Sequence, residues 1–494
     1  MSRRIQGNAS FAELQDSDGR IQVYFNRDEI CTSDDKSKYS VEGELFTTKV
    51  GQKSVRVTDF TLLSKALKPL PLPKEDAEGN LHDAFNDPEL RYRQRYADLV
   101  VNPNVKEVFV KRTKLFNAMR EFFNDAGYFE VETPILQPIP GGAAARPFIT
   151  HHNSLDIPLY MRIANELYLK RLIVGGFDGV YEFSKNFRNE GMDRTHNPEF
   201  TAMEIYVSYK DYNWMMSFCE QLLEHCALAV NGTSKATFGE HKIDFKAPYA
   251  RVTMADSIKH FTGFDITGKS EDEIREAAKN LGITVDNSMG KGKLIDEIFG
   301  EKCEGNYIQP TFITDYPKEM SPLCKEHRDN PELTERFELM VCGKEIANAY
   351  SELNDPIDQR ERFEHQLKLA AKGDDEATEF IDHDFLRALE YGMPPTSGMG
   401  IGMDRLIMFL TNNQSIQEVL FFPQMRPEKK ALAISDEAKT VLKTLKTAER
   451  LTLSDLKTQS GLSNKKWDKT IKELTKNSLA KVEKTDDGLF VEIV

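Results

Sequence analysis

The stretch Ser397-Gly398-Met399-Gly400-Ile401-Gly402-Met403-Asp404-Arg405-Leu406 decides the fold. Its glycines alternate strictly, and glycine on alternate residues describes a strand with one bare face, on which a flat ligand can lie. A dinucleotide-binding loop would instead read Gly-x-Gly-x-x-Gly with an acidic residue about 20 positions further on, and a P-loop would end in Gly-Lys-Ser/Thr. This stretch offers neither pattern. It therefore predicts a strand that leads into a helix, with Arg405 at the junction.

A second stretch combines Phe187-Arg188-Asn189-Glu190-Gly191 with Arg194-Thr195-His196-Asn197-Pro198-Glu199-Phe200. It lies between two predicted strands, 179–184 and 203–208. A long hairpin loop rich in Arg, His and Glu is suited to hold a bent polyphosphate, because the guanidinium group offers a planar fork to phosphate oxygens. The ordinary alternative is a solvated hairpin tip.

Glutamates 338, 345 and 352 are seven residues apart and would share one face of a long helix. The apolar alternation over 337–341 and the turn at 343–344 favour two strands instead. In a regular strand Glu345 and Glu352 point to opposite faces, so a bulge or the use of both faces is required. Carboxylates near phosphate-binding arginines predict a magnesium site.

Composition excludes several classes of protein. The 494 residues carry a net charge of −14, which argues against non-specific coating of nucleic acid. The apolar runs are far shorter than the ~18–20 residues that span a bilayer, and the first seven residues do not resemble a signal peptide. Six scattered cysteines without Cys-x-x-Cys argue against a zinc knuckle or a disulfide framework and favour the cytoplasm.

Proline-containing linkers divide the chain into three parts. Short apolar segments separated by turns over 5–64 predict a small barrel, and the repeated prolines of 68–73 predict a linker. The apolar spacing over 104–126 predicts a long helix. We expect a barrel in 1–66, a linker in 67–103, a catalytic domain in 104–427 with a helix-rich insertion at about 253–303, and a further domain in 431–494.

At this point the sequence resembles the class II aminoacyl-tRNA synthetases, and specifically the class II lysyl-tRNA synthetases. Gly127–Leu136 is similar to the first motif of the class, the loop 187–200 to the second, and Gly400–Arg405 to the third. Three further segments resemble the lysyl branch more than the aspartyl or asparaginyl branches: Pro140–Phe148, Ala164–Tyr168 and Ser351–Asn354.

The resemblance implies a fold and an activity. The expected architecture is an N-terminal OB-fold barrel and an α+β catalytic domain on an antiparallel sheet. The expected reaction is the ATP-dependent, Mg²⁺-dependent activation of L-lysine and its transfer to the 3′ end of tRNA(Lys). The first motif builds a dimer interface in this family, so a cytoplasmic homodimer is expected. The predicted helix carries Phe109, Phe116, Phe122 and Phe123, more aromatic residues than one buried face needs. A large apolar excess is typical of an interface, so we expect the dimer to form through the segment Val105–Leu136. We expect no membrane partner.

For ATP, the resemblance implies that Arg188 bridges the substrate carboxylate and the α-phosphate. Glu190 and His196 would face ATP, and Phe200 would stack under adenine. Arg405 would hold the γ-phosphate.

For lysine, the resemblance implies that Glu166 and the backbone near Gly142 receive the α-amino group. Asn348 would lie beside the carboxylate. Tyr206 and Glu352 would receive the ε-ammonium.

For the metal, Glu338 and Glu345 would hold magnesium at ATP. Arg4, Phe11 and Gln22 match barrel positions that meet the anticodon. However, Met1 falls inside the expected first strand and 30–41 is short for the helix of the barrel, which leaves open whether the barrel is complete.

The C-terminal segment has a composition of its own. Residues 429–494 contain 14 Lys and Arg against 10 Asp and Glu, a net charge of +4 that leaves −18 on the rest. Helices over 436–446, 453–459 and 465–477, followed by a hairpin, resemble a winged-helix module. Its lysines would be either a solvated face or a surface for the tRNA backbone. The expected core residues are Trp467, Ile471, Leu474, Ala480, Val482, Leu489, Val491 and Ile493.

Two alternatives belong to other functional classes. One is a lysine-type paralogue that modifies a protein, and such relatives lack the barrel. The other is a catalytically silent paralogue that only binds nucleic acid, which the presence of Arg188, Glu338 and Arg405 argues against.

Overall fold

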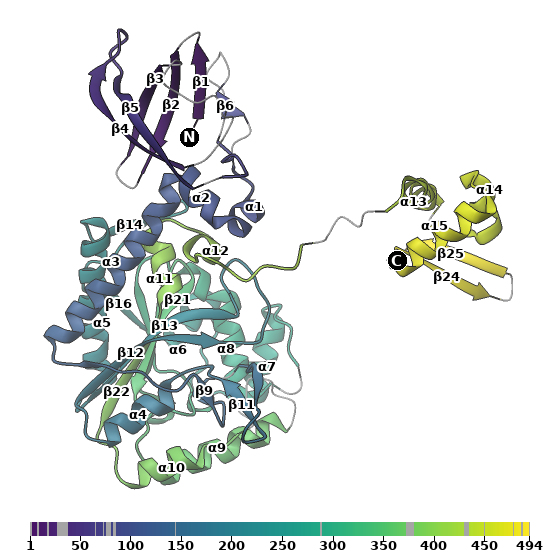
Figure 1. Ribbon diagram of the computed structural model, residues 1–494. Coiled ribbons are helices and arrows are strands. Elements are labelled where there is room, and N and C mark those ends of the chain that lie inside the picture. Colours follow the sequence, from purple (N-terminus) through teal and green to yellow (C-terminus); the bar gives the residue numbers. More distant parts are fainter. Residues whose placement is uncertain are drawn as a thin grey trace. The chain divides into compact units, whose positions relative to one another are not determined.

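The computed structural model describes residues 2–6, 9–16, 19–26, 38–64, 66–72, 74–75, 81–82, 85–143, 145–286, 289–371, 380–428, 434–448, 450–477, 479–485 and 488–493. The chain forms two compact units, Met1–Gln424 and Met425–Val494 (Figure 1). No helix within the described ranges is both long enough and apolar enough to cross a membrane.

The N-terminal sheet is built around a small apolar core that contains Ala12, Val23, Phe25 and Val57. Its strand order is β1-β2-β3-β5-β4, with antiparallel neighbours except for the parallel pair β3–β5. This topology is compatible with an OB-fold, although β1 and β4 are not paired with each other among the described strands. The segment 30–41, which is short for the helix of such a barrel, lies mostly within 27–37, outside the described residues. The strands are β1 (Ser2–Gln6), β2 (Ala9–Gln15), β3 (Arg20–Asn26), β4 (Lys38–Thr47) and β5 (Lys53–Ser64).

The segment 67–103, which we expected to be a linker, contains ordered structure. Two short strands, β6 (Lys74–Glu75) and β7 (Leu81–His82), precede the helices α1 (Pro88–Arg93) and α2 (Arg95–Val101). Arg91 pairs with Glu418 at 2.9 Å, and the buried Arg95 pairs with Asp98 at 2.5 Å. Arg95 also donates to the carbonyl oxygens of Gln417 and Leu420. Arg91 and Arg95 therefore fasten α1 and α2 to the catalytic domain, although the sequence predicted a linker here.

An eight-stranded sheet forms the centre of the catalytic domain, in the order β16-β17-β20-β21-β22-β13-β12-β8 (Figure 1). The pairs β16–β17 and β12–β8 are parallel, and the other neighbours are antiparallel. The expectation of an antiparallel sheet is thus correct for its middle and wrong for its edges. The strands are β8 (Phe129–Glu130), β12 (Gly179–Phe187), β13 (Glu199–Ser208), β16 (Ala250–Thr253), β17 (Thr311–Thr314), β20 (Arg336–Val341), β21 (Lys344–Ser351) and β22 (Thr396–Gly402).

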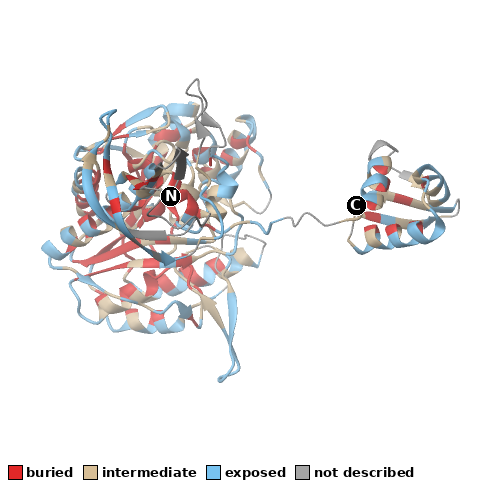
Figure 2. Ribbon diagram, turned by 45° about the horizontal axis from the view of Figure 1, so that its top comes forward, coloured by how far each residue is buried: buried red, intermediate tan, exposed pale blue. Residues whose placement is uncertain are grey.

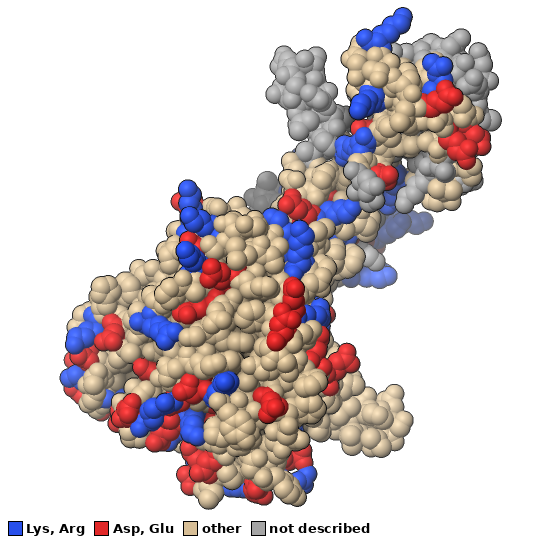
Figure 3. Space-filling model, turned by 90° about the vertical axis from the view of Figure 1, so that its left-hand side faces the viewer, with Lys and Arg blue, Asp and Glu red and all other residues tan. Residues whose placement is uncertain are grey.

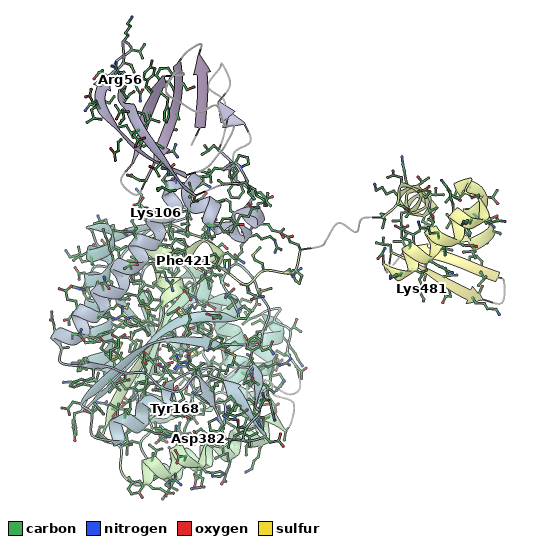
Figure 4. All side chains as sticks on the ribbon, in the orientation of Figure 1. Arg56, Lys106, Tyr168, Asp382, Phe421 and Lys481 are labelled. Atoms are coloured by element: carbon green, nitrogen blue, oxygen red, sulfur yellow. The ribbon has the colours of Figure 1, made fainter. Side chains whose placement is uncertain are left out.

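The long helices α3 (Pro103–Asp125) and α5 (Tyr212–Asn231) share the largest core with this sheet and with α11 (Met403–Leu410). Figure 2 shows the buried residues concentrated along the strands and the covering helices. Phe109 and Phe123 of α3 are buried, and Phe116 and Phe122 pack against the same core. The aromatic residues of α3 are therefore internal, which corrects our use of them as a sign of an interface. Phe109 also stacks on Phe421, with ring centroids 3.7 Å apart, and Phe421 is labelled in Figure 4.

A second helical layer and several short elements complete the domain. The helices α4 (Glu166–Val174), α9 (Pro356–Ala370) and α10 (His383–Glu390) contribute to a separate apolar cluster. The short elements are α12 (Ile416–Val419), β9 (Leu136–Gln137), β10 (Ile149–His152), β11 (Ile157–Met161), β14 (Lys235–Phe238), β15 (His241–Asp244), β18 (Glu326–His327), β19 (Asn330–Thr334) and the 3₁₀ turns Glu304–Asn306 and Lys318–Met320.

The segment that we expected to be a helix-rich insertion contains α6 (Met254–Thr262), α7 (Glu271–Asn280) and α8 (Lys291–Lys302), which bury a core of their own. Residues 263–270 spell Gly-x-x-x-x-Gly-Lys-Ser, the letters of a P-loop. They connect two helices instead of following a strand, and Ser270 forms a capping box with Glu273 while Lys269 pairs with Glu273 at 2.9 Å. The match is therefore a helix cap and lacks the strand–loop–helix context of a phosphate site.

The C-terminal unit contains three helices and a three-stranded sheet in the order β23-β25-β24. Trp467, Leu474, Ala480 and Val491 are buried, as predicted, whereas Leu489 and Ile493 are 44% and 37% exposed. The short helices cover only the middle of the last strand, so alternation alone overestimated the core. The elements are α13 (Asp436–Ala448), β23 (Arg450–Thr452), α14 (Leu453–Ser460), α15 (Asn464–Lys476), β24 (Ala480–Thr485) and β25 (Gly488–Ile493), of which β23 was not predicted.

Candidate active site

A cavity of about 1680 Å³ lies on the face formed by β20, β21, β22 and β13. Its size admits two substrates side by side. Glu352 is not part of the cavity lining. The lining brings together the other residues that we expected around ATP, lysine and the metal: Gly142, Glu166, Arg188, Glu190, His196, Phe200, Tyr206, Glu338, Glu345, Asn348 and Arg405.

The glycines of β22 have two different tasks. A Cβ atom on Gly398 would lie well inside van der Waals contact with Glu352 Oε1 and with the ring of Tyr206. A Cβ atom on Gly400 would have its nearest neighbour, Glu204 Cγ, at 3.7 Å. Gly398 is therefore required by close packing, and Gly400 leaves the bare surface that the alternation predicted.

Arg188 follows the end of β12, and Phe200 belongs to the antiparallel strand β13. The Arg188 guanidinium lies over the Phe200 ring, 5.2 Å from its centroid. Its Nε atom is buried and has no hydrogen-bond partner within the described part of the chain. A buried donor without a partner is costly, so this nitrogen is available to an anionic ligand in the cavity.

Asp193 organises the loop between these strands. Its carboxylate accepts hydrogen bonds from the backbone N–H groups of Thr195 at 2.6 Å and His196 at 2.8 Å. The His196 Nδ1 atom lies 2.7 Å from the same carboxylate. This arrangement holds the imidazole at the cavity, and Asp193 is a residue that the sequence reasoning missed.

A bulge, one of the two alternatives that the spacing of the glutamates left open, is present between β20 and β21. Leu339 pairs with Ala347, and Met340 pairs with Glu345, so Ile346 is the extra residue. The bulge allows both Glu338 and Glu345 to line the cavity.

Two arginines flank this pair of carboxylates. Arg336 pairs with Glu338 at 2.6 Å, and Arg405 lies 3.7 Å from the Glu345 carboxylate and also donates to the Glu345 carbonyl. Burial, together with the charge of Glu345, raises the pKa of Glu338 to about 7 despite Arg336. No cluster of three or more His, Cys, Asp or Glu side chains suited to a metal occurs among the described residues. Any cation there would need ligands from a bound substrate in addition to the two glutamates.

Gly142 and Glu166 lie at the opposite end of the cavity. Gly142 has φ of 88° and a Cβ atom there would lie 3.2 Å from the Ala164 Cβ and 3.3 Å from the Glu166 Cβ. Glu166 accepts a hydrogen bond from the Tyr350 hydroxyl at 2.7 Å. Asn348 accepts one from Arg336 Nε at 3.1 Å, which fixes its amide beside Glu338, its register partner.

Glu204 is a cavity residue that we did not predict. It is 8% exposed and accepts a hydrogen bond from the Tyr206 hydroxyl at 3.1 Å. Burial, with the charge of Glu166, raises its pKa to about 8. Its position two residues before Tyr206 on the same strand was a usable signal, because such residues share a face.

Lys170 was also missed. It is fully buried on α4, and its Nζ atom lies 2.5 Å from Glu166 Oε1 and also contacts the Glu352 carboxylate. Its spacing of four residues from Glu166, on the helix face of Leu167 and Ile173, could have revealed it.

Two of the anticodon residues predicted in the N-terminal sheet, Phe11 and Gln22, share one face of that sheet. Arg4 pairs with Phe11 in register, Phe11 pairs with Tyr24, and Gln22 lies two residues before Tyr24. The rings of Phe11 and Tyr24 have centroids 5.3 Å apart. Gln22 accepts a hydrogen bond from the Ser54 hydroxyl at 2.9 Å. Tyr24 is thus an aromatic neighbour that the prediction omitted.

Comparison with known proteins gives a consistent result. Residues 87–426 match the family model described as tRNA synthetases class II (D, K and N). A lysine–tRNA ligase from Christiangramia forsetii is 77% identical over 100% of this chain and 89% of the relative. Lysine–tRNA ligases from Porphyromonas gingivalis strain W83 and from Azobacteroides pseudotrichonymphae are 69% and 64% identical, each over 87% of this chain, and the matches cover 77% and 88% of those relatives.

Proposed function

The chain belongs to the class II tRNA synthetases of the D, K and N group, and from this premise we propose that it acts as a lysine–tRNA ligase. It activates L-lysine with ATP to lysyl-adenylate and transfers the lysyl group to tRNA. The observation that carries the proposal is the single cavity that joins an arginine-lined end to a pocket of buried carboxylates. An anionic nucleotide fits the first end and a cationic amino acid fits the second.

Adenylation needs no protein nucleophile. A carboxylate oxygen of lysine attacks the α-phosphorus of ATP, and the bond to the pyrophosphate leaving group breaks. The enzyme must position the two anions and neutralise the charge that collects between them. Arg188 is suited to both tasks because its unpartnered Nε can donate to either anion. Arg405, with one arginine nitrogen tied to the Glu345 carbonyl, is suited to hold the γ-phosphate.

The remaining contacts to the nucleotide are assigned to residues of the loop 187–200. We assign the adenine ring to Phe200, whose other neighbour is the Arg188 guanidinium. Glu190 and His196 line the cavity beside it. A base stacked on Phe200 would complete an aromatic and cationic sandwich.

A magnesium ion fits the donor set of Glu338 and Glu345. Burial and then the charge of Glu345 raise the pKa of Glu338, and Arg336 only partly opposes them. Magnesium is commonly bound by one or two carboxylates together with substrate phosphates, which matches a pair of glutamates beside the predicted triphosphate. When bound, the ion would offset phosphate charge.

The lysine pocket is the carboxylate end of the cavity. Glu166 and the backbone near Gly142 would receive the α-ammonium, and Asn348 would lie beside the carboxylate. At the far end, Tyr206 and Glu204 line the cavity, whereas Glu352 lies behind the lining. We therefore add Glu204 to the residues that meet the ε-ammonium, with Glu352 as a more distant partner.

Selectivity for lysine follows from the cost of an unmatched charge. A buried carboxylate is stable when an ammonium pairs with it and costly when it stands alone. A shorter or neutral side chain would leave Glu204 unmatched, so the site would reject it.

Binding of tRNA is assigned to surfaces outside the cavity. We propose that the strands that carry Arg4, Phe11 and Gln22 read the anticodon, since bases stack on aromatic rings and the rings of Phe11 and Tyr24 are only half-buried. We also infer that the C-terminal unit is a winged-helix module. Its helix α15 exposes five lysines, namely Lys465, Lys466, Lys469, Lys472 and Lys476. Over the catalytic part of the surface seen in Figure 3, acidic and basic side chains are interspersed.

A homodimer is proposed from exposed apolar side chains in the segment 127–161. Phe129, Leu136, Ile149 and Leu155 are 59%, 49%, 68% and 64% exposed. Several large exposed apolar side chains within one segment of the sequence indicate an interface. Sedimentation at micromolar concentration should give a dimer, and a monomer would contradict the proposal. A cytoplasmic location stays a prediction.

The function is tested by ATP–pyrophosphate exchange with each of the twenty amino acids, followed by charging of tRNA. We expect exchange with lysine alone and lysyl transfer to tRNA. Absence of exchange would favour the silent paralogue. Exchange without tRNA charging would favour the paralogue that modifies a protein.

A further inference from the structure

Lys170 lies at the centre of a buried charge cluster next to the lysine pocket. Its Nζ atom lies 2.5 Å from Glu166 Oε1 and also contacts Glu352 Oε2, which joins α4 to the end of β21. All three side chains are at most 7% exposed. The Tyr350 hydroxyl donates to the same Glu166 oxygen at 2.7 Å. The two carboxylates therefore share one ammonium of the protein itself.

The surroundings of Lys170 exclude water. The Tyr350 ring lies 5.5 Å and the Phe385 ring 5.8 Å from Nζ. Burial lowers the pKa of the Lys170 ammonium, but the charges of Glu166 and Glu352 outweigh burial and raise it. The ammonium is thus a permanent part of the pocket at physiological pH.

The presence of a lysine at position 170 calls for an explanation. Lys170 lies on the buried face of α4, between Leu167 and Ile173, where a leucine or methionine would pack equally well. A buried ion pair is seldom more stable than a well-packed apolar pair of the same volume. Stability alone therefore does not explain a lysine here, and its position beside the substrate pocket suggests another reason.

The charges of the pocket supply that reason. Three buried carboxylates, Glu166, Glu204 and Glu352, lie within interacting distance of one another. With the ammonium groups of lysine bound, which favour the charged form of these carboxylates, the ammonium of Lys170 cancels one of their three negative charges. The remaining two negative charges equal the two positive charges of the α- and ε-ammonium groups of lysine, while the substrate carboxylate lies toward Arg188.

We propose that Lys170 is a positioning and specificity-determining residue, a built-in counter-ion that holds Glu166 and Glu352 in place and matches the charge of the pocket to that of lysine. The proposal rests on the proposed function. It predicts that the loss of Lys170 leaves three carboxylates for two substrate ammonium groups and frees Glu352 from its fixed position.

Lys170→Met tests the proposal, because methionine keeps the length and removes the charge. In pyrophosphate exchange we expect the KM for lysine to rise about 100-fold or more, as for one lost partner of a buried pair, with the KM for ATP changed less than about threefold. The matched control is Arg171→Met on the same helix. Arg171 pairs with Asp382 at 2.6 Å and stacks on Tyr168, outside the carboxylate cluster. Tyr168 and Asp382 are labelled in Figure 4.

The double variant Lys170→Met/Glu352→Gln separates charge matching from simple loss of contacts. It removes one positive and one negative charge, so the net charge of the pocket is the same as in the wild type, and two carboxylates again face the two ammonium groups of lysine. We expect its KM for lysine to be lower than that of either single variant. A KM equal to the combined effect of both singles, or an unchanged KM in a folded Lys170→Met, would overturn the proposal.

Thermal melts of all variants identify those that fold. If Lys170→Met does not fold, the double variant is compared with the wild type alone. A KM for lysine within about tenfold of wild type then supports charge matching, and a rise of about 100-fold or more overturns it. Failure of the wild type to exchange with lysine would refute the proposed function, a result distinct from any effect of Lys170.

Discussion

Glu204→Gln should separate recognition of the lysine side chain from recognition of ATP. Glutamine keeps the shape of the side chain, and its amide oxygen can still accept the Tyr206 hydrogen bond seen at 3.1 Å. The change therefore removes the charge and little else. Loss of one partner of a desolvated ion pair costs about 3–5 kcal/mol, which corresponds to a rise of about 10²–10³ or more in the KM for lysine. The KM for ATP should stay nearly constant, because Arg188 and Arg405 are untouched.

The same variant has a signature in stability. Burial raises the pKa of Glu204 from its ordinary 4.5 to about 8 in the folded protein. The folded state then holds a proton that the unfolded state releases, so the free energy of unfolding falls as pH rises from about 4.5 to about 8. Glutamine does not titrate. Without lysine, the variant should therefore melt at a higher temperature than the wild type at pH 8, and the difference should vanish near pH 4.

Steady-state pyrophosphate exchange and pH-dependent melts measure the two effects. Glu199→Gln is the matched control, because Glu199 begins the same strand, is exposed and pairs only loosely with Lys185 at 3.6 Å. It should change neither quantity. An unchanged KM for lysine together with an unchanged pH profile of stability in Glu204→Gln would refute the assignment of Glu204 to the pocket.

Three other changes probe the rest of the molecule. Arg188→Ala should reduce exchange by about 10²–10³ or more with an unchanged melting temperature, and near-normal exchange would end its assignment. Replacing Glu338 or Glu345 by Ala should raise the magnesium concentration at which exchange is fastest. If the dependence of exchange on magnesium is unaltered in both variants, the two glutamates serve only as ion-pair partners of Arg336 and Arg405. Truncation after Lys430 should leave lysine activation intact, raise the KM for tRNA and reduce the salt dependence of tRNA binding, because backbone contacts act through counterion release. An identical salt slope would assign the tail a different task.

Strong local patterns allowed much of the fold to be predicted. The alternating glycines became β22. The odd spacing between Glu345 and Glu352 predicted either a bulge or the use of both faces, and the structure has a bulge at Ile346. The parallel edges of the sheet were missed because β8 and β16 have only two and four residues. Such short strands have no periodicity of their own and depend on tertiary pairing.

The site was predicted less completely because burial is a property of the fold. Arg188 and Arg405 belong to stretches with unusual composition, so sequence reasoning found them. Lys170 looks like an ordinary helix lysine paired with a glutamate four residues earlier, and only the structure reveals that it is fully buried. Similarly, the aromatic residues of α3 suggested an interface because their internal partners, such as Phe183 and Phe218, lie far away in the sequence.

The unequal room around the glycines of β22 limits how this pocket can be redesigned for unnatural amino acids. At Gly398 any side chain would collide with Glu352 and Tyr206, so that position must stay as it is. At Gly400 a methyl group would meet its nearest atom at 3.7 Å, an ordinary contact distance. A small side chain added there would narrow the cavity between the nucleotide and amino-acid ends without displacing the carboxylate cluster. Directed changes of substrate range should therefore begin at Gly400 and leave Gly398 unaltered.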